Sequence, residues 1–202
     1  MIDEATLAHR ATEALAAAYL LEDDPRWQSG FDGDAALWRQ ARELVVEAVD
    51  RDGTLLDVGC ANGHSMECLV TWAAERSRRL VVSVLELNPD LASMARHRLP
   101  AWADRIVEGN VLHWEPPRAF TYIRTGLEYV PVDRRVALVA RLLSAAVEPG
   151  GRLIVGPVSD GEVTETLAVL AAGGCSVPGV RTATDRTGKT RHVLWVEREF
   201  PA

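Results

Sequence analysis

Short apolar runs alternate with segments of helical periodicity from Thr54 onward. The apolar runs predict strands, and they are Thr54–Val58, Leu80–Leu85, Arg105–Val107, Tyr122–Ile123 and Arg152–Val155. Helical spacing of apolar positions predicts helices over His64–Arg76, Asp90–Arg98, Asp133–Val147 and Asp160–Ala172. Alternation of this kind favours right-handed crossovers into a mostly parallel sheet with helices on both faces. The pattern therefore predicts a doubly wound α/β fold.

The two ends of the chain differ from this alternation. Near the N-terminus, Asp3 and Asp34 are predicted to cap two helices, which are separated by an irregular loop over Glu22–Gly33. Near the C-terminus, Val180–Thr184 and His192–Glu197 flank a glycine-containing turn and predict an antiparallel hairpin. This hairpin is expected to close one edge of the sheet.

Two boundary signals accompany the later helices. The run Pro149-Gly150-Gly151 is predicted to end the helix that begins at Asp133. Ser159 and Glu162 have the spacing of a capping box, which predicts the start of the next helix.

The composition is that of a folded globular protein, since 48% of the 202 residues are hydrophobic and 25% are charged. The longest nearly uninterrupted apolar stretch, Leu80–Leu87, contains Ser83 and Glu86 and is far shorter than the roughly 20 residues of a spanning helix. The N-terminus is acidic, whereas a secretory signal begins with basic residues. We therefore expect a cytoplasmic protein that does not act at a membrane.

The negative charge lies almost entirely in the leading segment. Residues 1–50 hold eleven acidic and four basic residues, and the rest of the chain is neutral overall. The acidic segment favours either a cationic ligand or a solvated helical face. The one basic cluster, Arg76-Ser77-Arg78-Arg79, is too small for a nucleic-acid footprint, so a nucleic-acid partner is not expected.

Three cysteines, Cys60, Cys68 and Cys175, are an odd number without a Cys-x-x-Cys pair. They predict neither a disulfide framework nor a cysteine zinc site. His64 is interpreted as a packing or helix-start residue, with a role as ligand or base as the alternative, because no metal set accompanies it. No metal site is predicted.

A turn of small residues follows the first predicted strand, at the edge of the sheet where parallel α/β folds bind ligands. Gly59 and Gly63 relieve the steric limits on the backbone, and Ala61 allows a ligand to approach the main chain closely. A dinucleotide fingerprint begins in a similar way, but its later glycines would fall at Ala61 and His64. The turn therefore argues against a pyrophosphate and allows an anion such as a carboxylate at the helix N-terminus.

Two further polar residues follow neighbouring strands. Glu86 ends the second strand, where its carboxylate can accept both hydroxyls of a ribose and disfavours a 2′-phosphate. Asn110 follows Glu108-Gly109 at the end of the third strand and can accept a hydrogen bond from an adenine amino group. Together with the turn, they predict a nucleoside site.

With these residues, the chain over about Gly53–Glu197 resembles the class I S-adenosylmethionine-dependent methyltransferases. The four motifs that carry the resemblance are Leu-Leu-Asp-Val-Gly-Cys-Ala-Asn-Gly at 55–63, Leu-Glu-Leu-Asn-Pro at 85–89, Glu-Gly-Asn-Val at 108–111 and Glu-Pro-Gly-Gly-Arg-Leu-Ile-Val-Gly at 148–156. The resemblance implies a Rossmann-like sheet of seven strands in the order 3-2-1-4-5-7-6. It also implies S-adenosylmethionine as cofactor, with S-adenosylhomocysteine as product.

Carried over residue by residue, the resemblance assigns the cofactor to Asp57, Gly59, Cys60, Ala61, Gly63, Glu86, Leu87, Asn110 and Val111. In this assignment Asp57 belongs to the loop for the methionine portion, Glu86 holds the ribose and Leu87 covers the adenine. Asn110 replaces the Asp often found there, which keeps an acceptor and removes a charge. The alternatives are that Asp57 orients the loop, that Glu86 is an exposed strand-end charge and that Asn110 is a turn residue.

The acceptor is expected near Ile123–Pro131, which follows the fourth strand. There Glu128 and Tyr129 are the predicted catalytic residues, the first as a base or a holder of a cation and the second as a pocket wall. Arg124 is predicted to bind a substrate carboxylate, with a structural ion pair as its alternative, and packing is the alternative for Tyr129. Further predicted substrate residues are His113, Trp27 and Phe31.

Residues 1–50 are therefore predicted to form a helical cap over the substrate, and residues 51–202 the cofactor-binding core, within one compact domain. No Asn-Pro-Pro-aromatic run follows the fourth strand, so the chain does not resemble the methylases that modify amino groups of adenine or glutamine. The predicted function is therefore in-line methyl transfer to a small-molecule acceptor. The alternatives are a non-catalytic S-adenosylmethionine-binding module and a nicotinamide-dependent oxidoreductase.

Overall fold

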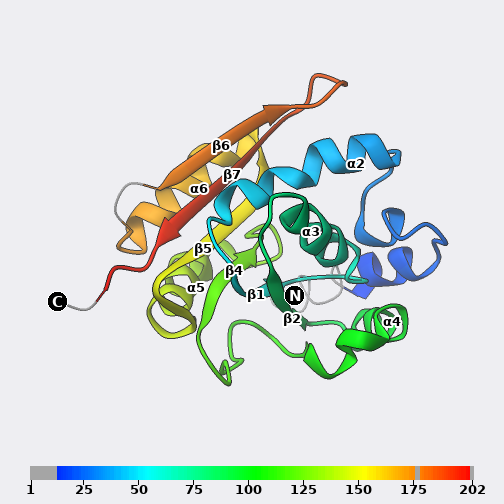
Figure 1. The fold of residues 1–202 in the computed structure, drawn as a ribbon, viewed down its shortest axis with the longest axis horizontal. Helices are drawn as coiled ribbons and strands as arrows, with labels where there is room; N and C mark the ends of the chain where they lie inside the picture. Colours follow the sequence, from blue (N-terminus) through cyan, green and yellow to red (C-terminus); the bar gives the residue numbers. More distant parts are fainter. Residues whose placement is uncertain (1–12, 176–177, 201–202) are drawn as a thin grey trace, which may run out of the picture.

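A seven-stranded sheet forms the centre of the protein in a computed structural model that describes residues 13–175 and 178–200. The strands are β1 (Gly53–Val58), β2 (Leu80–Glu86), β3 (Ile106–Glu108), β4 (Phe120–Thr125), β5 (Val147–Ser159), β6 (Gly179–Thr184) and β7 (Thr190–Glu197). Their order is β3-β2-β1-β4-β5-β7-β6, as predicted (Figure 1). The first five strands of this order pair in parallel, and β7 is antiparallel to both β5 and β6. The predicted doubly wound α/β fold with a terminal hairpin is confirmed.

Helices cover both faces of the sheet. The α-helices include α2 (Ala35–Arg42), α3 (His64–Glu75), α4 (Pro89–Arg98), α5 (Val132–Arg141) and α6 (Asp160–Ala172). The shorter turns are η1 (Trp27–Ser29), η2 (Glu43–Ala48), η3 (Pro100–Arg105) and the π-helical η4 (Leu142–Ala146). Residues 13–20 are also helical, and the predicted cap Asp3 lies outside the described residues. Within the described chain, no helix is long and apolar enough to cross a membrane.

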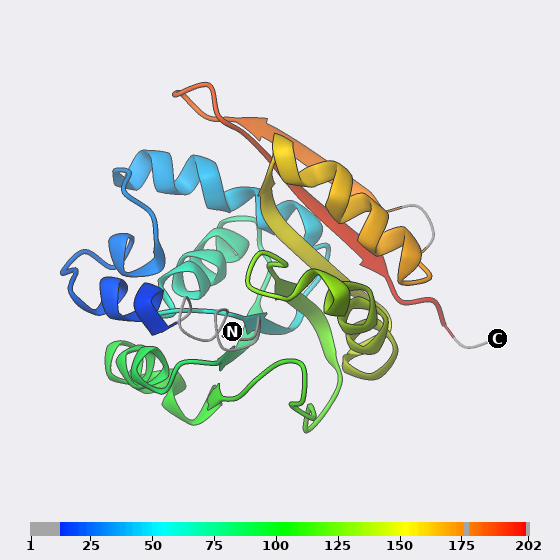
Figure 2. The same cartoon turned by 180° about the vertical axis from the view of Figure 1, so that it is seen from behind.

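Two hydrophobic clusters fill the space between the sheet and its helices. One packs side chains of η2, α3 and α4 against the face of the sheet that carries Leu55, Val82 and Ile154 (Figure 1). The other packs α5, η4 and α6 against the opposite face, which carries Leu56 and Ile123 (Figure 2). Because neighbouring residues of a strand point to opposite faces, these buried strands are apolar on both sides.

The predicted helix boundaries hold at the N-terminal ends and fail at one C-terminal end. The Asp34 side chain accepts a hydrogen bond from the Leu37 amide, and the capping box at Ser159 is present. The predicted stop at Pro149-Gly150-Gly151 is wrong, because the helix ends at Ala146 and these residues belong to β5. The register between β4 and β5 shifts there, so the glycines form an irregularity in a strand rather than a helix cap.

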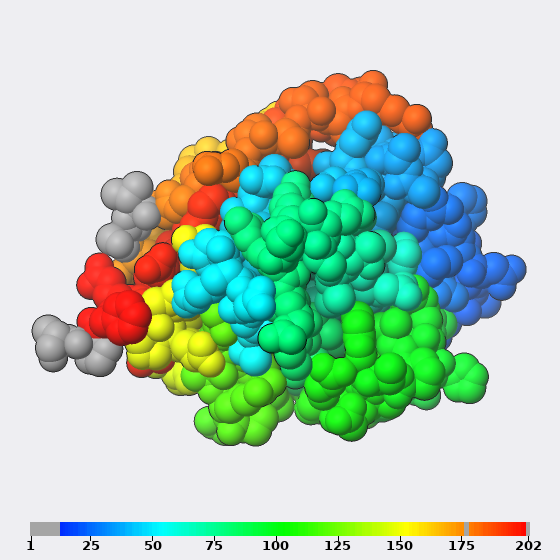
Figure 3. Space-filling model, in the orientation of Figure 1, coloured from blue at the N-terminus to red at the C-terminus, as the bar shows by residue number. Residues whose placement is uncertain are grey.

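The N-terminal segment lies along one side of the core. In Figure 3 it is the blue region beside the orange hairpin of β6 and β7. The Arg186 side chain in the hairpin turn forms an ion pair with Asp34, and the Arg186 amide donates a hydrogen bond to Gln40. These contacts join the hairpin to the start of α2.

Candidate functional site

The loop between β1 and α3 has the backbone conformation that its small residues predict. Gly59 and Gly63 have φ angles of 75° and 77°, in the region that favours glycine. Ala61 also has a positive φ, of 50°. Asn88 caps α4 on the neighbouring crossover, so two helices begin side by side at the carboxyl ends of β1 and β2.

Glu86 holds this loop in place. One oxygen of its buried carboxylate accepts a hydrogen bond from the Ala61 amide at 2.8 Å, and the other accepts one from the Asn88 amide at 3.0 Å. Burial raises the pKa of Glu86, and the hydrogen bonds from the backbone oppose that rise. The Glu86 carboxylate, which is the predicted ribose partner, is therefore already hydrogen-bonded to the chain.

Asp57 and Arg124 form a buried ion pair across β1 and β4. They occupy paired positions of the two strands, and the Arg124 guanidinium lies 3.1 Å from one oxygen of the Asp57 carboxylate. Arg124 Nε also donates to the Gly156 carbonyl at 2.8 Å. Burial raises the pKa of Asp57 while the Arg124 cation opposes that rise, and the second oxygen of Asp57 has no partner among the described residues. The structure thus directs Arg124 to the core, and its predicted contact with a substrate stays a prediction.

Tyr129 lies where β1 and β4 end. Its hydroxyl donates to the Val58 carbonyl at 2.6 Å and accepts from the Gly126 amide at 2.9 Å. A Cβ added at Gly59 would lie 2.9 Å from the Tyr129 ring, so the ring covers Gly59. Burial raises the pKa of the Tyr129 hydroxyl, which therefore stays protonated at neutral pH.

Asn62 connects the loop to the N-terminal segment, a role that its sequence context did not indicate. This fully buried side chain donates to the Pro25 carbonyl at 2.8 Å and to the Gln28 side chain at 2.9 Å. Its oxygen accepts from the His64 amide. The His64 ring stacks on Trp38 with centroids 5.0 Å apart, which agrees with the packing interpretation.

The predicted adenine residues lie beyond β2 and β3. The Asn110 side chain accepts a hydrogen bond from the Leu112 amide at 2.9 Å, so it closes a turn, and Val111 is buried. Leu87 is exposed and faces a cavity of about 310 Å³ between the 13–20 helix and the start of α4. His113 is exposed.

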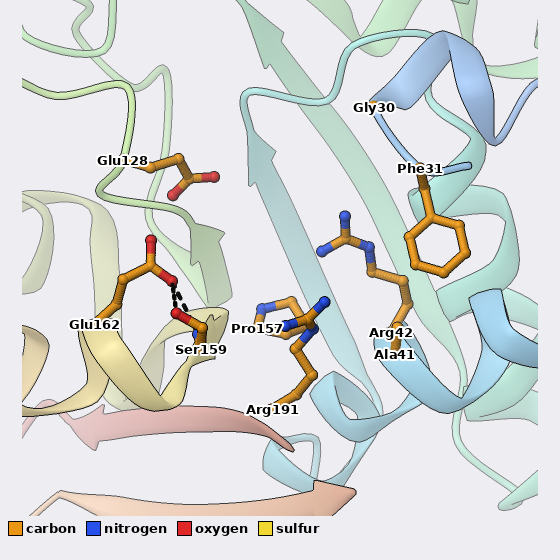
Figure 4. Close-up of a pocket in the computed structure, with 9 residues that line it drawn as sticks. All are labelled: Gly30, Phe31, Ala41, Arg42, Glu128, Pro157, Ser159, Glu162 and Arg191. Carbon is orange, nitrogen blue, oxygen red and sulfur yellow. Dashed lines mark hydrogen bonds between the residues drawn. The ribbon is translucent and has the colours of Figure 1, made fainter. Parts of the chain in front are cut away.

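A second cavity, of about 250 Å³, is lined by Gly30, Phe31, Ala41, Arg42, Glu128, Pro157, Ser159, Glu162 and Arg191 (Figure 4). We name it the arginine cavity. It includes predicted residues Phe31 and Glu128, whereas Arg42 and Arg191 were not predicted. Trp27, in η1, is 46% exposed and is not one of its lining residues.

The arginine cavity contains two positively charged side chains, Arg42 and Arg191. The Arg42 guanidinium lies over the Trp38 and Phe31 rings, at 5.3 and 5.9 Å from their centroids. Burial lowers the pKa of Arg42 to about 10, so the group stays charged at neutral pH. The side chains of Arg42 and Arg191 form no hydrogen bond or ion pair with any residue in the described part of the chain. Figure 4 shows both guanidinium groups opposite the carboxylates of Glu128 and Glu162.

The hydrogen-bond acceptors at the ends of β1 and β2 fit a nucleoside with a cationic substituent. Glu86 offers a carboxylate at the predicted sugar position, and the unpartnered oxygen of Asp57 is a buried acceptor near the loop. Within the described ranges, no group of three or more His, Cys, Asp or Glu side chains could hold a metal ion. The one obstacle is the Tyr129 ring, which a ligand packed on Gly59 would have to displace.

Comparisons with known proteins agree with this geometry. No family model matches the chain. A trans-aconitate 2-methyltransferase of Rhodopseudomonas palustris strain BisB5 is 33% identical over 118 residues, which are 58% of this chain and 43% of that protein. A protein of the same name from Sinorhizobium medicae is 30% identical over 118 residues, with the same shares of each chain. The chain thus spans less than half the length of these curated relatives.

Solved structures share the fold. The sugar N-methyltransferase KedS8 from Streptoalloteichus sp ATCC 53650 has a TM-score of 0.63 at 19% identity, over 89% of this chain and 94% of that one. The S-adenosylmethionine-dependent methyltransferase SibL has a TM-score of 0.61 at 17% identity, over 81% and 56%. The [4+2]-cyclase SpnF has a TM-score of 0.66 at 15% identity, over 95% of each chain. The predicted resemblance is therefore confirmed: the relatives in sequence are methyltransferases, and the fold is that of S-adenosylmethionine-dependent methyltransferases.

Proposed function

We propose that this chain binds S-adenosylmethionine at the carboxyl ends of β1, β2 and β3 and transfers its methyl group to a small molecule in the arginine cavity. The observation that carries the proposal is the junction of two sites at the ends of β1 and β4. On one side lies the glycine loop bound to Glu86, and on the other lies a charged cavity that Glu128 lines. Ligands of open α/β sheets bind at this edge, where the strand order reverses.

The residues that would hold the cofactor are the predicted set around Gly59, Glu86 and Asn110. Glu86 would accept hydrogen bonds from the ribose, and Leu87 and Val111 would pack on the adenine. S-adenosylmethionine supplies a methyl group on a sulfonium, so transfer breaks the sulfur–carbon bond, leaves its electron pair on sulfur and yields a neutral thioether. The contribution of the chain is to place the acceptor atom in line with that bond.

Glu128 is the proposed proton acceptor. It is exposed on the wall of the arginine cavity, and it has no hydrogen-bond partner in the described chain. A carboxylate in this position can take the proton that a hydroxyl or ammonium acceptor loses as the new bond forms. An acceptor that arrives already ionised does not need this step.

The relatives suggest the first acceptor to test. The relatives are named trans-aconitate 2-methyltransferases, so trans-aconitate is the first compound to test. Residues 1–50 would form one wall of the acceptor site, which is supported by Phe31 and Arg42 in the lining of the cavity. A non-catalytic binding module stays the alternative, because a fold does not determine an activity.

Calorimetry with S-adenosylmethionine, S-adenosylhomocysteine and, as a control, NAD tests cofactor binding. Gly59→Ala should weaken binding of S-adenosylhomocysteine at least tenfold, because its φ of +75° and the nearby Tyr129 ring oppose a side chain. Gly174→Ala is the matched control, since Gly174 has a φ of +83° and nothing within 4 Å. It should share the backbone strain, about 1–2 kcal/mol, and keep the affinity.

Transfer of a labelled methyl group to trans-aconitate and to a panel of small acceptors tests the reaction. Binding of S-adenosylmethionine without transfer to any acceptor would favour the non-catalytic module. Binding of neither S-adenosylmethionine nor S-adenosylhomocysteine, in a protein that is folded by circular dichroism, would contradict the proposal.

A further inference from the structure

The arginine cavity holds two cations whose side chains form no ion pair or hydrogen bond with the described residues. Arg42 comes from the last turn of α2, and Arg191 comes from β7, where it pairs with Ser159 of β5. Their guanidinium groups point into the same cavity (Figure 4). Two elements from opposite ends of the chain therefore bring two positive charges to one place.

The Arg42 cation carries an electrostatic cost that an anion would reduce. A buried charge loses hydration, and an anion in direct contact with it restores Coulomb attraction. For Arg42, burial is the largest cause of the lowered pKa; the nearby cations Arg124 and Arg191 add repulsion, and the carboxylates of Glu128 and Asp57 oppose it. The Phe31 and Trp38 rings stabilise the Arg42 guanidinium but leave its N–H donors without acceptors in the described residues. The positive charge and these N–H donors match what an anionic ligand requires.

The same cavity limits the charge and size of that ligand. Glu128 and Glu162 line the opposite wall, and they disfavour a group with two negative charges. The Glu162 carboxylate is already used, because it accepts hydrogen bonds from the Ser159 amide and hydroxyl at 2.9 and 2.6 Å. A volume of about 250 Å³ is below the usual range for drug-sized ligands. A planar carboxylate with one charge matches the fork of a guanidinium.

We infer that Arg42 and Arg191 bind a carboxylate of the methyl acceptor and thereby select small carboxylic acids as substrates. This inference rests on the proposed function and names its substrate class. One carboxylate of the acceptor lies between the two guanidinium groups. The group to be methylated then faces Glu128 and the ends of β1 and β4.

Calorimetric titration of the full chain, saturated with S-adenosylhomocysteine, tests this inference. The ligands are trans-aconitate, a panel of aliphatic and aromatic monocarboxylates and dicarboxylates, the trimethyl ester of trans-aconitate, and inorganic phosphate. At least one acid should bind, and Arg42→Gln and Arg191→Gln should each weaken it about 10- to 100-fold, as expected for a charged hydrogen bond. Arg42→Lys should lose less, because it keeps the charge.

Two controls make the result specific to the cavity. Arg79→Gln changes an exposed arginine outside the cavity and should leave the affinity for the acid within twofold. The affinity for S-adenosylhomocysteine should also stay within twofold in every variant, which shows that each one is folded. The trimethyl ester should bind wild type and Arg42→Gln equally weakly, because it lacks the charge that Arg42 recognises.

Three results would overturn the inference. The first is unchanged affinity for the acid in both glutamine variants. The second is binding of no acid by protein that binds S-adenosylhomocysteine, which would leave the proposed function standing. The third is phosphate binding that is tighter than that of every acid, which would assign the cavity to a phosphate. Failure to bind S-adenosylhomocysteine would instead contradict the proposed function.

Discussion

The charged groups at the glycine loop and those in the arginine cavity differ in their partners. At the loop, Glu86 accepts two backbone hydrogen bonds, and Asp57 is paired with Arg124. In the arginine cavity, Arg42 and Arg191 have no such partner in the described chain. The loop is therefore fixed by folding itself, whereas the cavity keeps its charges for a ligand.

Because of this difference, substitutions in the two regions should affect stability and ligand binding differently. A change at the loop removes interactions of the folded chain, so it should lower the free energy of unfolding as well as the affinity for the cofactor. A change in the arginine cavity removes a cation that the fold leaves unpaired, so it should lower acceptor affinity with little loss of stability. The following four changes test this contrast.

Arg124→Met should have the largest effect. It leaves the Asp57 carboxylate buried without a counter-charge, and breaking a buried ion pair in this way costs about 3–5 kcal/mol. Urea denaturation followed by circular dichroism measures the loss. Because a domain of this size has a total stability of about 5–15 kcal/mol, the variant should be close to unfolding at 37 °C.

The double variant Asp57→Asn with Arg124→Met provides the control. It removes the uncompensated charge and should recover part of the lost stability. A loss below about 1 kcal/mol in the single variant would mean that Asp57 does not depend on Arg124. In that case Arg124 would be free for its predicted contact with a substrate carboxylate.

This ion pair also shows where sequence analysis reaches its limit. The pattern of apolar runs predicts both β1 and β4, but the pairing of Asp57 with Arg124 depends on the register between two strands that lie far apart in the chain. Register follows from packing across the whole sheet, so the structural alternative for Arg124 could be stated but not chosen. By contrast, Gly59, Gly63 and Glu86 lie in local motifs, and the structure brings them together as predicted.

No local sequence motif marks Arg42 or Arg191 as a residue of the site. Arg42 belongs to the polar side of an amphipathic helix and Arg191 to one strand of a hairpin, and in a sequence both look like ordinary solvent-facing arginines. Only the tertiary fold places α2 against the hairpin and turns both guanidinium groups toward β5. A single sequence contains the residues but not this juxtaposition.

Glu86→Ala should lower the free energy of unfolding and the free energy of cofactor binding by about 1–3 kcal/mol each. The two amides that bind its carboxylate lose their acceptor, and the ribose loses a charged partner. Denaturation measures the first loss, and calorimetry with S-adenosylhomocysteine measures the second. Glu148→Ala is the matched control, since Glu148 accepts a hydrogen bond from Thr121 away from the loop and should alter stability alone.

Unchanged affinity in a folded Glu86→Ala variant would show that the carboxylate serves only the loop. The prediction of a ribose partner would then be wrong, although the fold would be unaffected.

Tyr129→Phe should lower stability by about 0.5–1.5 kcal/mol and raise cofactor affinity two- to tenfold. The hydroxyl holds the ring over Gly59 through Val58 and Gly126, so its removal makes the ring easier to displace. Tyr122→Phe is the control, because its hydroxyl binds Asp50 and Arg51 far from the loop. Weaker cofactor binding would contradict this expectation, and a loss of kcat without a change in affinity would instead support the predicted catalytic role of Tyr129.

Arg186→Ala should have the smallest effect. The ion pair of Arg186 with Asp34 joins the hairpin that carries Arg191 to the helix that carries Arg42, but both partners are more than half exposed. Exposed pairs contribute about 0–1 kcal/mol and are screened by salt. The loss of stability should therefore be within 1 kcal/mol in dilute buffer and vanish in 1 M sodium chloride. A larger loss that persists at high salt would mean that the hairpin contact fixes the arginine cavity, and the cavity would then depend on folding as strongly as the loop does.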